Sequence, residues 1–246
     1  MKMMRYIEKY KKLIFILFFF MPFVIANDNK TNIFFEKSRV IFDKNEQNKS
    51  YFKMVNSGDK PVLMQAWIKN KNDESSDDIK KDDHNNFIVV PPLVKVDPTN
   101  ENLFEVIKKD SNFSKDREEI NYLMIKIIPP QEKDSHEITL TPVFNFKIYH
   151  RPENIPAIED SQFYENIKFH LDGNKLHVEN ASPYFISFSY IKINGIDISN
   201  EELINMVNPF SHKEYKVTGK PLNKKISWVY INSVGFNSKE MTSFLD

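Results

Sequence analysis

The chain has 246 residues, but it contains no cysteine and only five glycines. Without cysteine it can form neither a disulfide nor a thiolate-bound zinc site, and it has no thiol nucleophile. Its stability must therefore come from the burial of apolar side chains alone. The scarcity of glycine argues against the glycine-rich loops that cradle phosphate groups. The absence of cysteine and the scarcity of glycine therefore argue against thiol-dependent and nucleotide-dependent enzymes.

An excess of charge of either sign is also missing, because 34 basic residues balance 34 acidic ones. Domains that bind nucleic acid normally carry a strongly basic patch, so we expect no nucleic-acid partner. The six histidines are scattered and form no His-Glu-x-x-His motif, and there is no Gly-x-Ser-x-Gly turn. No two carboxylates stand out as an acid and base pair. The sequence therefore predicts a protein that is not an enzyme and has no metal site or cofactor.

The N-terminus has the pattern of a secretory signal. Five basic residues lie within the first 12, and the uncharged apolar run Leu13–Ala26 follows them. This run is shorter than the roughly 20 residues that a membrane-spanning helix needs, and Pro22 interrupts it. We expect residues 1–26 to be a signal peptide that is cleaved after Ala26. The mature protein is then exported, and the alternative is a membrane anchor.

The rest of the chain is typical of an all-β protein. Short runs rich in Val, Ile, Phe and Tyr alternate with turn-forming clusters, and only Asn200–Val207 predicts a helix, of one or two turns. This spacing favours antiparallel sandwiches over alternating strands and helices. The charged segment Lys69–Asn86 lacks the regular ligand spacing of a calcium loop and is interpreted as a hairpin tip. Strands are expected at 32–35, 39–42, 50–55, 62–68, 87–90, 103–107, 121–128 and 137–149, and at 167–171, 175–179, 185–193, 214–217 and 226–231.

A domain boundary is expected in the segment Arg151–Pro156, where two prolines stop the preceding strand. The prediction is thus an N-terminal domain over residues 27–152 and a C-terminal domain over residues 153–246. Both lengths are ordinary for a β-domain.

Eight short segments of the chain are informative as a set: Ser38–Phe42, Gln65–Ile68, Phe87–Pro92, Asp116–Glu118, Ile127–Pro130, Phe146–Pro152, Val178–Phe185 and Tyr230–Gly235. Together they resemble the PapD-like periplasmic chaperones, which assemble pili by the chaperone–usher pathway. Each segment is weak alone, but their order and separation are specific. The resemblance implies two immunoglobulin-like β-sandwich domains set at an angle, with a cleft between them. It also implies a location in the periplasm, with pilus or fimbrial subunits and an outer-membrane usher as partners.

The resemblance further implies that one strand of the protein completes the sheet of an unfinished subunit. An open sheet edge is a template for aggregation, and an extended donor strand with alternating apolar side chains covers it. The segment Glu137–Tyr149 has this alternation, and its expected donor residues are Ile138, Leu140, Pro142 and Phe144. Because proline has no amide hydrogen, an added strand is expected to lose one ladder bond at Pro142, or the donor strand is expected to kink there. From the pattern alone, the same segment also fits an ordinary half-buried strand.

Matching of motifs assigns two further groups of residues. Arg39 and Lys147 take the places of the basic pair that grips the subunit's terminal carboxylate, through charge-assisted hydrogen bonds. Glu118, Arg151 and Ser233 take the places of a charged interdomain cluster, in which serine replaces an acid. The short loop before the donor strand resembles the short-loop subgroup, and a free protein is expected to be able to cover its donor strand by self-dimerisation.

The main alternative is an exported adhesive or carbohydrate-binding β-sandwich. Trp67 and Trp228 are candidates for stacking on sugars, but each lies within an apolar strand. Both are therefore interpreted as core residues. A pilus subunit would also be expected to have a single domain, whereas this sequence predicts two.

Overall fold

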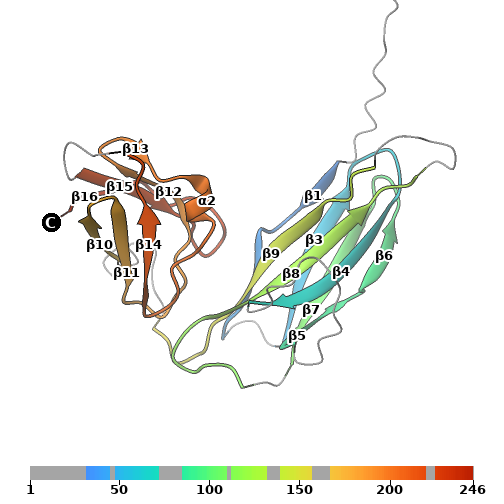
Figure 1. The fold of residues 1–246 in the computed structure, drawn as a ribbon. Helices are drawn as coiled ribbons and strands as arrows, with labels where there is room; N and C mark the ends of the chain where they lie inside the picture. The colour runs from blue at the N-terminus through green and yellow to red at the C-terminus, as the bar shows by residue number, and fades with distance from the viewer. Residues whose placement is uncertain are drawn as a thin grey trace, which may run out of the picture. The chain divides into compact units, whose positions relative to one another are not determined.

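The computed structural model describes residues 32–44, 48–71, 85–109, 112–131, 139–156, 167–219 and 225–245. They form two β-sandwiches from consecutive parts of the chain (Figure 1). Both sandwiches belong to one compact unit, Thr31–Asp246. The expected signal peptide and most of the expected hairpin tip lie outside the described residues. Within the described ranges, no helix is long and apolar enough to cross a membrane.

The first sandwich packs a four-stranded sheet against a five-stranded sheet. The four-stranded sheet has the order β1-β3-β7-β5, and the five-stranded sheet has the order β2-β9-β8-β4-β6. All pairs are antiparallel except β2 with β9, which is parallel. The strands are β1 (Ile33–Phe35), β2 (Arg39–Phe42), β3 (Lys49–Asn56), β4 (Val62–Asn70), β5 (Phe87–Val90), β6 (Leu93–Val96), β7 (Glu101–Lys108), β8 (Glu119–Ile128) and β9 (Val143–His150).

Alternation of side chains explains how this sandwich is held together. On β3, Phe52 and Met54 are buried, while Tyr51 between them is exposed, as expected for a strand with one face on a core. Phe146 and Ile148 of β9 are buried in the same core, which therefore fixes one face of β9. Burial of each large apolar side chain contributes about 1.5–3 kcal/mol.

The second sandwich is built in the same way from a three-stranded and a four-stranded sheet. Their orders are β10-β11-β14 and β13-β12-β15-β16, and all pairs are antiparallel. A separate core of residues between Ile167 and Leu245 holds the sheets together. The elements are β10 (Ile167–Asp172), β11 (Lys175–Asn180), β12 (Phe188–Ile193), β13 (Ile196–Asp197), α2 (Asn200–Leu203), β14 (Ser211–Lys216), β15 (Lys225–Tyr230) and β16 (Met241–Phe244).

Most expected strands are present, and the prediction of an all-β protein with two sandwiches is confirmed. The helix α2 is a single turn that starts after the N-cap Ser199, whose side chain accepts a hydrogen bond from the Glu202 amide. Two expectations are wrong. The strand expected from Glu137 begins only at Val143. Trp228 is buried, but Trp67 is only half-buried, because it lies on the face of β4 opposite the core residues Ala66 and Ile68.

Candidate functional site

The first half of β9 is an open sheet edge in the described structure. On one side β9 pairs with β8 along its whole length, from Val143 opposite Lys126 to His150 opposite Glu119. On its other side, β2 covers only the residues from Lys147 to His150. No described strand pairs with Val143–Phe146 on that side. Such an edge presents unpaired backbone groups and is a template for another strand.

The hydrogen-bond pattern shows which backbone groups face this open edge. The Ile127 amide donates to the Pro142 carbonyl at 3.0 Å, so the backbone groups of residue 142 point toward β8. At the far end of β9, the Arg151 amide donates to the Phe42 carbonyl at 2.8 Å. The backbone groups of residue 151, an odd-numbered position, therefore point to the β2 side. Because backbone groups alternate along a strand, the amides of Val143 and Asn145 point to the open edge.

This geometry corrects the expectation for Pro142. The amide hydrogen that proline lacks would point toward β8, not toward the open edge. The missing bond is therefore one internal to the protein, between residue 142 and Ile127. A strand that adds to the open edge loses no donor at this position.

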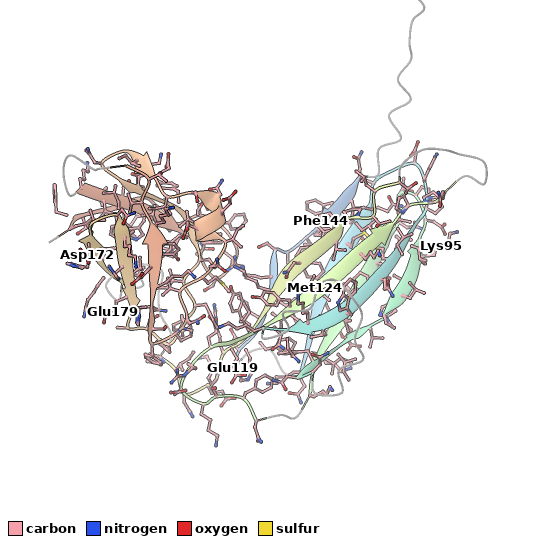
Figure 2. All side chains as sticks on the ribbon, viewed as in Figure 1. Lys95, Glu119, Met124, Phe144, Asp172 and Glu179 are labelled. Atoms are coloured by element: carbon pink, nitrogen blue, oxygen red, sulfur yellow. The ribbon has the colours of Figure 1, made fainter. Side chains whose placement is uncertain are left out.

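The apolar face of β9 continues past the end of its own core. The exposed fraction rises from 0% at Ile148 and 9% at Phe146 to 37% at Phe144 and 79% at Leu140. Pro142 is exposed as well. The Phe144 ring projects from β9 beside β1, with its centroid 5.0 Å from that of Phe35 (Figure 2). The same side-chain parity that fills the core thus becomes an exposed apolar row.

Arg39 and Lys147 lie at the end of this open edge. They are direct partners in the parallel register of β2 and β9, although they are far apart in the sequence. Arg39 Nη1 donates to the Asn232 carbonyl at 2.9 Å, and Lys147 Nζ donates to Ser187 Oγ at 3.1 Å. Both acceptors belong to the second sandwich. The buried Arg39 Nε has no hydrogen-bond partner among the described residues.

The environment of the two cations is unfavourable for positive charge. Burial, and then the charge of Arg39, lowers the pKa of Lys147 from its usual value to about 8. Burial also lowers the pKa of Arg39, whose guanidinium carbon lies 5.7 Å from the centroid of the Tyr149 ring. An unsatisfied donor and two neighbouring cations in a partly desolvated site are suited to bind an anion.

Glu118 and Arg151 form a buried pair beside this site. Arg151 Nε donates to Glu118 Oε1 at 2.7 Å, and the Phe185 amide of the second sandwich donates to Glu118 Oε2 at 2.9 Å. Glu118 is only 2% exposed, and its burial raises its pKa, while the Arg151 charge opposes that rise. Among the described residues, no hydrogen bond or ion pair joins Ser233 to either partner. One carboxylate thus connects the two sandwiches without a second acid.

The structure brings most of the predicted site residues together. Arg39, Glu118, Arg151 and Ser233 line one pocket, which also contains Tyr149 and Ser187. Lys147 contacts Ser187 of this pocket. The predicted donor residues Leu140, Pro142 and Phe144 lie along the adjoining edge, and Ile138 lies outside the described residues. The described residues contain no group of three or more His, Asp or Glu arranged to hold a metal ion.

Three polar residues of the site were missed by the sequence analysis. Tyr149 follows Lys147 by two positions, so the period of a strand would have placed both on one face. Ser187 and Asn232 contact the cations from the second sandwich. No pattern in the sequence indicates these contacts, because they depend on how two separate domains meet.

Comparison with protein families then identifies the chain. Residues 32–156 match the model of the N-terminal domain of PapD, a pili and flagellar-assembly chaperone. Residues 162–242 match the model of the C-terminal domain of the pili assembly chaperone PapD. The chain belongs to the PapD family of pilus-assembly chaperones. Its function is that of a chaperone for pilus subunits. The two family matches favour a chaperone over the alternative, an adhesive or carbohydrate-binding protein.

Individual relatives cover nearly the whole chaperone. The chaperone protein CssC of Escherichia coli is 26% identical over 246 residues, which are 96% of this chain and 100% of CssC. In solved structures, the SafB chaperone of Salmonella enterica, in complex with the SafA pilin, has a TM-score of 0.72 at 22% identity and covers 88% of this chain and 97% of its own. The E. coli chaperone DraB also has a TM-score of 0.72, at 23% identity, and covers 88% and 97%. These structures show that the fold is shared.

Proposed function

We propose that the chaperone captures a pilus subunit by adding the open edge of β9 to the subunit's incomplete sheet. One observation carries this proposal: the register of β2 and β9 places Arg39 beside Lys147 at the point where the open edge ends. A chain end bound by the two cations lies directly in line with the free amides of Val143 and Asn145. In strand addition, such main-chain groups supply affinity and alternate side chains supply specificity.

The position of the cations also determines the direction of the captured strand. They lie at the C-terminal end of the open stretch, beside Lys147. A strand whose terminal carboxylate is bound there must run toward Lys147, which is the direction of β9 itself. The subunit's last strand is therefore proposed to pair with β9 in parallel.

The exposed apolar row supplies the second part of the binding energy. Leu140 and Phe144 are 79% and 37% exposed in the chaperone alone. Burial of a large apolar side chain in the groove of a subunit contributes about 1.5–3 kcal/mol. We propose that Ile138, Leu140, Pro142 and Phe144 all face this groove, and that the capture of a SafA-like pilin, as in the structure with SafB, is a model for it.

The remaining partners follow from the same proposal. We infer that residues 1–26 direct export to the periplasm, with domains at 27–152 and 153–246, and that the loaded chaperone delivers its subunit to an outer-membrane usher.

A chaperone without subunit leaves the β9 edge uncovered. We propose that a second copy of the chaperone then covers this edge. Glu118 and Arg151 are proposed to hold the two domains together, and Ser233 to line the same pocket without charge.

The test is to replace each cation with alanine in the mature chaperone and to co-express it with candidate pilus subunits from neighbouring genes. Each charge-assisted hydrogen bond contributes roughly 1.5–3 kcal/mol, so Arg39→Ala and Lys147→Ala are expected to weaken capture at least tenfold. The measurement is the yield of the one-to-one complex by affinity purification and size exclusion. Lys95→Ala is the matched control, since Lys95 is an exposed lysine of β6 paired with Asp97. Parental yield from both cleft variants would contradict the proposal.

A further inference from the structure

The exposed apolar row Leu140, Pro142 and Phe144, which begins before β9 and ends within it, is uneven in size at its centre. Leu140 and Phe144 have long side chains, whereas Pro142 between them has a short one. The proline ring closes onto its own nitrogen, so it extends less far from the strand than a leucine side chain does. Any groove that accepts this row must accommodate a short side chain between two long ones.

The main chain does not account for the proline. Because the Ile127 amide donates to the Pro142 carbonyl, the missing amide hydrogen of residue 142 faces β8. The outward donors at Val143 and Asn145 are unaffected. Proline also keeps the preceding Thr141 out of the helical region, which maintains an extended segment but does not select among partners. Toward a partner, the distinctive property of residue 142 is therefore the size of its side chain.

In strand addition, pockets for alternate side chains determine which partner is accepted. We propose that the subunit bound by this chaperone has a deep apolar pocket for Leu140 and a shallow pocket for Pro142, so that residue 142 determines which subunits are accepted. This inference rests on the proposed function. It concerns the chemistry of the partner, which is a β-domain whose open groove has large side chains filling its floor opposite Pro142.

Close packing predicts opposite size preferences at the two positions, because residue 140 must be large and residue 142 must be small. Leu140→Ala leaves a cavity in the deep pocket, and Pro142→Leu forces extra carbon atoms into the shallow one. Each change is expected to weaken capture by about tenfold or more. Pro142→Ala adds no bulk and restores the amide, so its capture is expected to stay within about threefold of the parent.

The experiment uses the mature chaperone and the candidate pilus subunit that it captures from among the products of neighbouring genes, and it measures the affinity of the complex for each variant. Thermal unfolding of each chaperone alone checks folding, which is expected to be unchanged because residues 140 and 142 are exposed. A subunit in which a large residue of the groove floor opposite Pro142 is replaced by alanine is expected to restore capture by Pro142→Leu.

The outcomes separate the two proposals. Parental capture by Pro142→Leu, with loss in Leu140→Ala and Arg39→Ala, overturns the shallow pocket and leaves strand addition intact. Loss of capture in Pro142→Ala also overturns it, because the rigid ring would then matter more than its size. Parental capture by Leu140→Ala and Arg39→Ala would overturn strand addition together with this inference.

Discussion

Arg39 and Lys147 are held side by side although both are cations. Their positions are fixed from the second sandwich, by the Asn232 carbonyl and the Ser187 hydroxyl. Repulsion and desolvation make this arrangement unfavourable in the free chaperone, as the lowered pKa of Lys147 indicates. A bound carboxylate would offset both penalties, because it neutralises the repulsion and accepts hydrogen bonds from both cations. The free-energy cost of arranging the donors is therefore incurred during folding and not during capture.

Capture should depend on pH through Lys147. The pKa of this lysine in the free chaperone is about 8, below its usual value of 10.5. A bound carboxylate favours the charged form, so binding takes up a proton once the pH exceeds about 8. We expect affinity to be constant between pH 6.5 and pH 7.5 and to fall by up to about tenfold per unit as pH rises above 8. Isothermal titration calorimetry of subunit binding, from pH 6.5 to above pH 8, measures this change in affinity.

Lys147→Arg is the control for this prediction. Arginine stays charged over the whole range, so its binding curve should be flat where that of the parent falls. Equal losses in the parent and in Lys147→Arg would assign the pH dependence to another group.

The strand β9 has two different halves because its neighbours differ. Its second half, Lys147–His150, is enclosed between β8 and β2. Among the described strands its first half pairs only with β8, and the core-facing row emerges there into solvent. One continuous pattern of alternating apolar residues thus serves a core at one end and an exposed edge at the other.

A proline at an outward-facing position should act differently from the natural proline at 142. Asn145→Pro removes a donor that points to the open edge, where the described structure has no strand. One hydrogen bond contributes about 0.5–1.5 kcal/mol, so we expect affinity for the subunit to fall by about 2- to 12-fold. The unfolding temperature of the chaperone alone should stay nearly constant, as checked by calorimetry. A large drop in that temperature, with unchanged affinity, would mean that the amide of residue 145 has an internal role.

The extent of β9 shows why only part of it could be predicted. Alternation over Glu137–Tyr149 predicted a strand, because the period of two is intrinsic to a strand, and the structure has a strand over the Val143–Tyr149 part of it. The start of β9 at Val143 depends on pairing with β8. Because Pro142 has no amide hydrogen, residues 142 and 127 form one hydrogen bond where a full antiparallel pair would form two. The parallel pairing of β2 with β9 joins residues more than 100 positions apart, and periodicity contains no information about it.

Glu118 connects the two sandwiches, since its carboxylate accepts from Arg151 on one side and from the Phe185 amide on the other. The matched motifs assigned Glu118 and Arg151 to one cluster, and in the structure the two side chains form a hydrogen-bonded ion pair. The contact with Phe185 was not predictable, because it uses a backbone amide, which has no signature in the sequence. Ser233 lines the same pocket but carries no charge, so Glu118 is the single acid among the three residues assigned to the interdomain cluster.

Removal of Glu118 should therefore destabilise the whole chaperone. Glu118→Ala leaves the Arg151 guanidinium without its partner and the Phe185 amide without an acceptor. Breaking a buried pair costs about 3 kcal/mol or more, and we expect this loss in the free energy of unfolding from urea titration. Glu179→Ala is the control, since the exposed Glu179 faces Lys168 at 3.6 Å and should contribute less than about 1 kcal/mol. Similar values for both variants would rule out the bridging role.

The short parallel pairing of β2 with β9 also has a practical consequence. A strand that docks along the open edge of β9 and runs toward Lys147 meets the first residue of β2, Arg39, which already occupies the next stretch of the same edge. The beginning of β2 is therefore an end stop, beyond which a guest polypeptide cannot continue in line. Epitope or affinity tags fused after a pilin's final residue should block its capture, so tags for reconstitution belong elsewhere in the pilin.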